Sequence, residues 1–170
     1  NIETILDSYI GLNRSIVFVS NWRSNEYGKS ILKKYKNHKN IFLIGPIYDV
    51  SKINPDIIVG ITRGGLLPAL HLSHHLERPM MTIQWQTRDA SKCEHNKDLQ
   101  SMIDKGKTVV FVDDINDTGR TFSEISKAYH CSRPNVHFVS LVSKTETRYP
   151  ANAALSLHDE RWIVFPWEKD

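Results

Sequence analysis

The stretch that decides the fold is Val109-Val110-Phe111-Val112-Asp113-Asp114-Ile115-Asn116-Asp117-Thr118-Gly119-Arg120-Thr121. It begins with a continuous apolar run, which is typical of a β-strand covered on both faces of a sheet. Two adjacent carboxylates, Asp113 and Asp114, follow at the carboxyl end of this predicted strand, and Asp117 adds a third. A small-residue turn then opens a helix. This order predicts a polar site at the carboxyl end of the strand.

Each part of this site suits a different chemical group. The turn at 118–121 offers backbone N–H groups, two hydroxyls and a helix N-terminus, which suit a phosphate monoester. Asp113 and Asp114 can accept hydrogen bonds from a sugar diol or hold a hydrated Mg²⁺. Asp117 is placed to exchange a proton with a group on the sugar. The alternative is a plain helix with Asp117 at its N-cap, which leaves the other two carboxylates unexplained.

Apolar runs and helical stripes alternate around this stretch. We predict strands at 56–62, 80–85, 108–113 and 136–142, and helices at 66–76 and 122–130. Strands that alternate with helices need crossover connections, so the fold class is α/β, a doubly wound, mostly parallel sheet flanked by helices. Such sheets bind ligands at the carboxyl ends of their strands.

The remaining segments are less regular. The polar residues 86–107 show no periodicity and predict a long loop. Helical stripes at 2–10 and 27–35, a short strand at 16–19 and an apolar run at 41–44 occupy the N-terminal third.

Composition limits the class of protein. The chain has 170 residues, of which 40% are hydrophobic and 24% charged, which is typical of one globular domain and excludes a disordered or fibrous protein. The net charge of +3 gives no reason to expect nucleic acid. Cys93 and Cys131 form no disulfide framework, and no apolar run reaches the ~20 residues of a membrane span. We expect a cytoplasmic protein with free thiols and no membrane or nucleic-acid partner.

The stretch 109–121 resembles the phosphoribosyl pyrophosphate (PRPP) binding motif of the type I phosphoribosyltransferases. That motif has an apolar strand, two acidic residues, two usually apolar residues, a further acidic residue and Thr-Gly-x-Thr. Asn116 departs from it, being polar where an aliphatic residue is common. The resemblance implies that Asp117 is the catalytic residue, which takes a proton from the acceptor base. It also implies that Asp113 and Asp114 bind PRPP and, indirectly through substrate and water, the Mg²⁺ cofactor. The remaining PRPP-binding residues of the motif are Thr118, Gly119, Arg120 and Thr121.

A second segment, residues 61–69, resembles the pyrophosphate loop of the same family. The resemblance implies that Arg63, Gly64 and Gly65 bind PRPP, with the charge of Arg63 facing the leaving pyrophosphate. It also implies a non-proline cis peptide bond, which would fall between Arg63 and Gly64.

The C-terminal third indicates the purine branch, most similar to the xanthine-guanine (hypoxanthine) phosphoribosyltransferases. Lys144 follows a predicted strand, and in the purine enzymes that this chain resembles a lysine at that position donates to O6 of the base. Because its ammonium group has only donors, it would favour a 6-oxopurine over a 6-aminopurine. By resemblance, Trp162 stacks on the base and the Ile163 carbonyl accepts from its edge. The alternatives are an exposed lysine at a strand end and aromatic residues that only cover the sheet, as we expect for Trp167.

One segment departs from the family pattern. The hypoxanthine and guanine enzymes carry Ser-Tyr near the start of a mobile loop, whereas this chain reads Gln84-Trp85-Gln86-Thr87-Arg88-Asp89. The long polar stretch can still close over the site as a lid, with Arg88 supplying the missing contact.

The resulting hypothesis is a single phosphoribosyltransferase domain over residues 1–170. It would transfer the 5-phosphoribosyl group from PRPP to guanine, xanthine or hypoxanthine in purine salvage, giving the nucleoside monophosphate and pyrophosphate. The terminal segments would form a small hood beside the sheet. Residues 1–50 match no motif and would supply part of this hood or a dimer contact, in a homodimer or homotetramer. The alternatives are transfer to another base or a non-catalytic, nucleotide-sensing regulator on the same fold.

Overall fold

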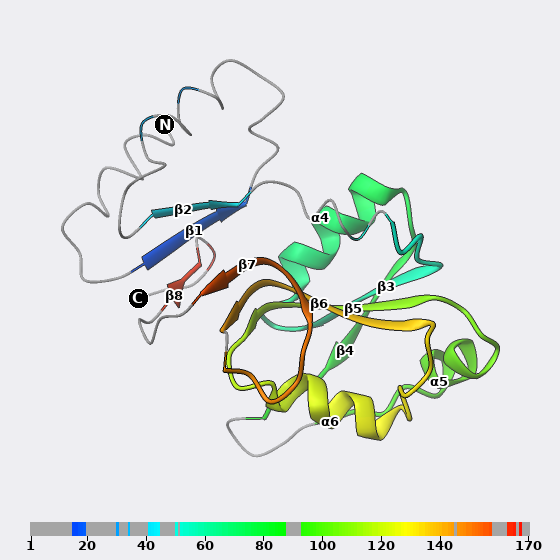
Figure 1. Ribbon diagram of the computed structural model, residues 1–170. Helices are drawn as coiled ribbons and strands as arrows, with labels where there is room; N and C mark the ends of the chain where they lie inside the picture. The colour runs from blue at the N-terminus through cyan, green and yellow to red at the C-terminus, as the bar shows by residue number, and fades with distance from the viewer. Residues whose placement is uncertain are drawn as a thin grey trace. The chain divides into compact units, whose positions relative to one another are not determined.

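The computed structural model describes residues 15–19, 30, 34, 41–44, 50, 52–87, 93–144, 146–157, 163–165 and 167. Contacts divide the chain into two compact units. One consists of Asn1–Pro46 with Asp159–Asp170, and the other of Ile47–His158. The second, larger unit contains the motif that decides the fold (Figure 1).

The larger unit is built on a five-stranded sheet in the order β4-β3-β5-β6-β7. Its strands are β3 (Ile57–Thr62), β4 (Met80–Gln84), β5 (Val109–Asn116), β6 (Val136–Lys144) and β7 (Asn152–Leu157). Every neighbouring pair is parallel. The predicted parallel α/β sheet is confirmed, and its apolar strands β3 and β5 lie inside it, where both faces are covered.

Helices cover both faces of this sheet. Successive side chains of a strand point to opposite faces, so Phe111 and Val112 of β5 belong to two different core clusters. The cluster of Phe111 includes residues of α5 (Lys97–Asp104) and α6 (Arg120–Ala128), and the cluster of Val112 includes residues of α4 (Leu66–Leu76). Figure 1 shows α4 on one side of the strands and α5 and α6 on the other. The doubly wound arrangement predicted from the sequence is therefore present.

The prediction of a long loop over 86–107 is wrong, because this segment contains α5. Asn96 is its N-cap, and the side-chain oxygen of Asn96 accepts hydrogen bonds from the backbone N–H groups of Asp98 and Leu99, each at 3.0 Å. Leu99 and Ile103, one turn apart, are fully buried. A helix of eight residues with two buried positions is too short for its period to stand out from polar neighbours.

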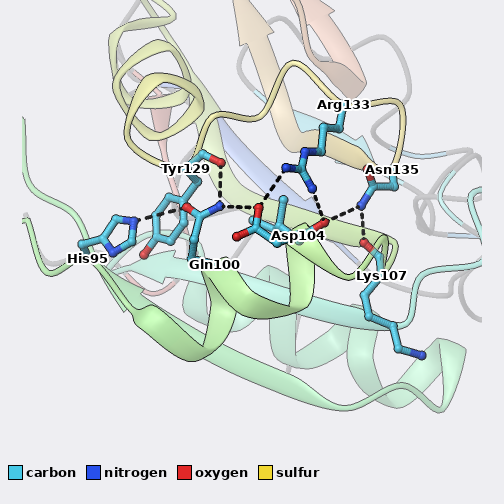
Figure 2. Close-up of polar contacts among 8 residues, drawn as sticks. His95, Gln100, Asp104, Lys107, Tyr129, Arg133 and Asn135 are labelled. Carbon is cyan, nitrogen blue, oxygen red and sulfur yellow. Dashed lines mark hydrogen bonds and ion pairs between the residues drawn. The ribbon is translucent and has the colours of Figure 1, made fainter.

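Polar contacts join α5 to the segment between α6 and β6 (Figure 2). The Arg133 guanidinium donates to the carbonyl of Ile103 at 3.1 Å and forms an ion pair with Asp104 at 3.0 Å. The side-chain amide of Asn135 donates to the carbonyl of Lys107 at 2.6 Å. These contacts hold α5 near the amino ends of β5 and β6, away from their carboxyl ends.

Several boundaries differ from the predicted ones. β7 was not predicted, because it contains alanines, which are depleted in strands, and it lies at the sheet edge, where half-exposed and exposed residues alternate. β5 and β6 extend to Asn116 and Lys144, beyond the predicted ends, and α6 begins at Arg120.

The smaller unit contains a three-stranded parallel sheet in the order β2-β1-β8. Its strands are β1 (Ser15–Val19), β2 (Ile41–Ile44) and β8 (Ile163–Val164). The predicted strand at 16–19 is confirmed, and the apolar run at 41–44 is also a strand. Of the helical stripes, the first lies outside the described residues, and in the second only Ser30 and Lys34 are described, both helical.

None of the helices in the described parts of the chain combines the length and the apolar character that crossing a membrane requires.

Replacing Asn96 with alanine tests the N-terminus of α5. Asn96→Ala removes the acceptor of two backbone N–H groups. We therefore expect the free energy of unfolding to fall by about 1 kcal/mol and the melting midpoint to fall by about 2–4 °C. Asn96→Asp keeps an N-capping oxygen and should melt close to the wild type. Thermal denaturation followed by circular dichroism measures both, and equal losses in the two variants would contradict the N-cap role.

Candidate active site

β5 carries the acidic pair to the carboxyl edge of the sheet. Asp113 lies beside Ser140 of β6, and Asn116 lies beside Ser143. Because β5 continues to Asn116, the acidic pair lies within the strand rather than beyond its tip. Asp113 is partly buried and Asp114 is buried. The sheet thus fixes the backbone of both aspartates.

In this position the carboxylates of Asp113 and Asp114 repel each other. Burial of the Asp113 carboxyl, together with the charge of the neighbouring Asp114, raises the pKa of Asp113 well above its ordinary value. The Oδ1 atom of Asp113 accepts a hydrogen bond from the backbone N–H of Asp114 at 3.0 Å, which offsets only part of this effect. A ligand that brings hydroxyl donors or positive charge would relieve the repulsion.

The turn after β3 packs directly against the acidic pair. A Cβ atom at Gly64 would overlap the carboxylate of Asp114, and one at Gly65 would overlap the carbonyl oxygen of Val112. Glycine is required here by close approach rather than by a special backbone conformation. Arg63 is exposed beside this turn. The predicted pyrophosphate loop and the acidic pair therefore form one continuous surface.

The non-proline cis peptide bond joins Thr62 to Arg63. The prediction that it joins Arg63 to Gly64 is wrong by one residue. The close packing of Gly64 and Gly65 on β5 begins just after this bond.

A second turn, residues 117–121, leads from β5 into α6. Gly119 is the N-cap of α6, has φ +79°, and provides no side-chain hydrogen bond to the helix. The alternative in which Asp117 is the N-cap is therefore wrong. The hydroxyl of Thr118 accepts from the backbone N–H of Arg120 at 3.3 Å. This arrangement leaves the N-terminus of α6 suited to an anion.

The residues that follow β6 support this second turn. A Cβ atom at Gly119 would come too close to the backbone nitrogens of Arg148 and Tyr149. The N–H of Arg148 donates to the carbonyl of Thr118 at 3.1 Å. The turn is therefore packed between α6 and the segment before β7.

Sequence reasoning missed Glu124, which contacts this turn, and Trp85, which contacts Glu124. The carboxylate of Glu124 accepts from Arg120 Nε at 2.7 Å and from the indole N–H of Trp85 at 3.4 Å. The spacing of four between Arg120 and Glu124 on a helix is a signal for the first contact, but nothing in the sequence links Trp85 to α6. Glu124 thus connects the turn at 117–121 to the start of the predicted lid.

The predicted lid, residues 86–107, is anchored at its start and again from Cys93 onward. Trp85 forms an antiparallel bridge with Cys93, and the N–H of Glu94 donates to the carbonyl of Gln84 at 3.2 Å. The hydroxyl of Tyr129 accepts from the N–H of Asn96 at 2.8 Å. Arg88 lies outside the described residues, so its role stays a prediction.

The predicted base-binding residues come from different parts of the chain. Lys144 is the last residue of β6, the strand next to β5 at the same sheet edge. Ile163 belongs to β8 in the smaller unit, and Trp162 lies outside the described residues. Trp167, expected to cover the sheet, stacks on the buried Phe165 with ring centroids 5.1 Å apart.

The carboxyl edge of the larger sheet thus gathers most of the predicted site. The residues concerned are Arg63, Gly64, Gly65, Asp113, Asp114, Asp117, Thr118, Gly119, Arg120, Thr121 and Lys144. Two glycine turns at helix N-termini flank an acidic pair there. These features define an α/β protein whose site is suited to a sugar that carries phosphate groups at two positions.

Comparison with known proteins agrees with this class. The phosphoribosyl transferase domain family matches residues 30–169, and the chain belongs to this family of enzymes. It is 31% identical over 118 residues to a xanthine-guanine phosphoribosyltransferase of Cereibacter sphaeroides, an alignment that covers 65% of this chain and 68% of the relative.

Solved structures show the same relationship. A purine phosphoribosyltransferase from Pyrococcus horikoshii is similar with a TM-score of 0.61 and 26% identity, covering 91% of this chain and 95% of that one. The Helicobacter pylori xanthine-guanine-hypoxanthine phosphoribosyltransferase is similar with a TM-score of 0.57 and 26% identity, covering 82% and 89%. The resemblance inferred from the motifs is confirmed at the level of the family.

Replacing Asp113 with asparagine tests the electrostatic cost of the site. In the wild type the folded state holds the Asp113 proton more tightly than the unfolded state, so stability falls as the pH rises from about 4 to the raised pKa. Asparagine does not titrate and its oxygen can still accept from Asp114. We expect Asp113→Asn to be more stable than the wild type at pH 7. Each kcal/mol gained in the free energy of unfolding should raise the melting midpoint by about 2–4 °C.

Thermal melts of the ligand-free proteins between pH 4 and pH 8 measure this difference. The advantage of Asp113→Asn should be small near pH 4 and should grow with pH before levelling off. A variant that is less stable than the wild type at pH 7 would show that the carboxylate is favourably placed without ligand.

Proposed function

We propose that this enzyme transfers the 5-phosphoribosyl group of PRPP to N9 of a 6-oxopurine, giving the nucleoside monophosphate and pyrophosphate in purine salvage. The observation that carries the proposal is the position of Lys144. It ends the strand beside the acidic pair, at the edge where the two glycine turns lie. A lysine side chain can donate to the O6 atom of guanine, xanthine or hypoxanthine but cannot accept from the 6-amino group of adenine. The names of the similar enzymes, xanthine-guanine and purine phosphoribosyltransferases, support the same acceptor class.

The two turns suit the two phosphorylated ends of PRPP. The turn at 118–121 would bind the 5-phosphate through its backbone N–H groups and hydroxyls at the start of α6. The turn at 63–65 would bind the pyrophosphate, with the Arg63 guanidinium adding positive charge. Asp113 and Asp114, between them on β5, would accept hydrogen bonds from the ribose hydroxyls. The contact of Gly64 with Asp114 supports this order.

The acidic pair also suits Mg²⁺, although not as a complete site. Carboxylate oxygens are ligands that Mg²⁺ prefers, and repulsion between Asp113 and Asp114 favours a cation. Within the described residues, no group of three or more His, Cys, Asp or Glu side chains could hold a metal ion. Substrate and water oxygens would therefore complete the shell around Mg²⁺, which would neutralise charge on the leaving pyrophosphate.

The proposed reaction is a substitution at the anomeric carbon of ribose. The bond from this carbon to the pyrophosphate oxygen breaks, and its electron pair leaves with pyrophosphate. The N9 lone pair of the base forms the new bond, and Asp117 accepts the proton that leaves N7. Asp117 is half-buried directly after the end of β5, close to both the acidic pair and the phosphate-binding turn.

Other parts of the proposal rest on the sequence. Trp162 would stack on the base, the Ile163 carbonyl would accept from the base edge, and Arg88 would act from the lid. Cytoplasmic purine salvage is compatible with Cys93 and Cys131, which are both free thiols. A homodimer or homotetramer is also proposed, and sedimentation velocity would identify it.

Pyrophosphate release tests the function directly. The assay contains Mg²⁺ and PRPP with guanine, xanthine, hypoxanthine, adenine, orotate or uracil, each in a separate reaction. We expect turnover with at least one 6-oxopurine and far less with the other three bases. Turnover only with adenine, orotate or uracil would refute the acceptor class, and PRPP binding without any turnover would favour a regulator.

Replacing Asp117 tests proton transfer. Asp117→Asn keeps the size and a hydrogen-bonding oxygen but cannot take the proton, so kcat should fall about 10²–10⁴-fold. The dissociation constant of PRPP, measured by titration calorimetry, should change little. A variant that retains the wild-type kcat would rule out Asp117 as the proton acceptor.

A further inference from the structure

Asn116, the residue that departs from the family motif, is buried at the end of β5. Asn116 is only 3% exposed, and its side-chain amide nitrogen lies near three acceptors. This nitrogen lies 3.2 Å from the Ser143 hydroxyl, 3.4 Å from the Thr147 hydroxyl and 3.0 Å from the Tyr149 carbonyl, and its two N–H groups are shared among these three acceptors. A buried amide is costly unless it is hydrogen-bonded, so these contacts hold the side chain in one place.

One of these contacts leads to the proposed base-binding lysine. Asn116 and Ser143 are register partners on β5 and β6. The Ser143 hydroxyl accepts from Asn116 and donates to the carbonyl of Lys144 at 3.3 Å. A hydrogen-bonded chain thus runs from the end of β5 to the backbone of Lys144.

The other contacts lead to the phosphate-binding turn. Asn116 donates to the carbonyl of Tyr149, and the neighbouring N–H of Arg148 donates to the carbonyl of Thr118 at 3.1 Å. Gly119 packs against the backbone of the same two residues. Asn116 is therefore linked through a single segment to the turn that receives the 5-phosphate.

The segment at 147–149, which links Asn116 to this turn, is itself held by packing and by a hydrogen bond. The Tyr149 ring packs edge-on against Phe138 of β6, with centroids 5.1 Å apart, and against Phe122 of α6, with centroids 6.5 Å apart. The Thr147 hydroxyl also donates to the Tyr149 carbonyl at 3.0 Å. The segment at 147–149 is thus anchored in the core, and Asn116 ties it to the strand that carries the acidic pair.

We propose that Asn116 is a positioning residue that fixes the phosphate-binding turn relative to Lys144, and so aligns the anomeric carbon of PRPP with N9 of the base. This inference rests on the proposed function, since it assumes that the two places bind the two substrates. The reaction needs the two reacting atoms about 3–3.5 Å apart, and a displacement of 1 Å can cost about 10²-fold in rate. A residue that touches neither substrate can therefore control kcat.

Asn116→Leu is the main test, because leucine has a similar size and no hydrogen-bond donor. With the base that the wild type uses fastest, we expect kcat to fall about 10–100-fold. The dissociation constants of PRPP and of the nucleoside monophosphate should stay within about threefold, since each subsite remains intact. Ser143→Ala, which breaks only the link towards Lys144, should show a smaller fall in kcat. This variant replaces Asn116→Leu as the test if Asn116→Leu does not fold.

Asn135→Leu is the matched control. Asn135 also donates from its side chain to a backbone carbonyl, that of Lys107, but at the amino end of β5. This variant should melt earlier with an unchanged kcat, as expected for a purely structural asparagine.

The outcomes separate the two proposals. An unchanged kcat in Asn116→Leu, or a fall matched by an equal loss of PRPP binding, would overturn the positioning role. Wild-type turnover only with a base other than a 6-oxopurine would refute the proposed acceptor but leave the comparison of variants valid. A wild type that is inactive with every base would overturn both.

Discussion

The close approach of Gly64 to the Asp114 carboxylate is the contact on which the rest of the site depends. It joins the turn after β3 to the end of β5, so the predicted pyrophosphate loop and the acidic pair share one surface. The same edge keeps Asp113 beside Asp114, where burial and like charge raise its pKa. Without ligand this arrangement is electrostatically unfavourable, and we propose that a ligand that supplies donors and positive charge relieves it.

Two helices are placed to extend this principle to anionic groups, as we propose for the phosphates of PRPP. α4 and α6 both begin at the carboxyl edge of the sheet, and their N-caps, Gly65 and Gly119, make no side-chain cap hydrogen bond. In most helices a side chain satisfies part of the first turn, whereas here the N-termini are suited to phosphate groups. One sheet edge therefore combines two turns suited to anions with an acidic pair between them.

Much of this could be predicted from the sequence, because the fold-determining runs are long and apolar. The strands β3 and β5, the helix α4 and the site residues around Asp113 follow from local patterns and from the motif. The helix α5 could not be predicted, since only Leu99 and Ile103 mark its buried side. The contacts of Asn116 with Tyr149 and of Glu124 with Trp85 join residues far apart in the chain, and no local pattern in the sequence indicates them.

Residue-resolved amide hydrogen exchange, measured with and without PRPP and Mg²⁺, tests the central claim most directly. If the two glycine turns bind the two phosphorylated ends of one substrate, the backbone N–H groups at 63–64 and at 119–121 should gain protection together on addition of PRPP. Protection of one turn alone, or of neither, would contradict the account in which this sheet edge is a single PRPP site.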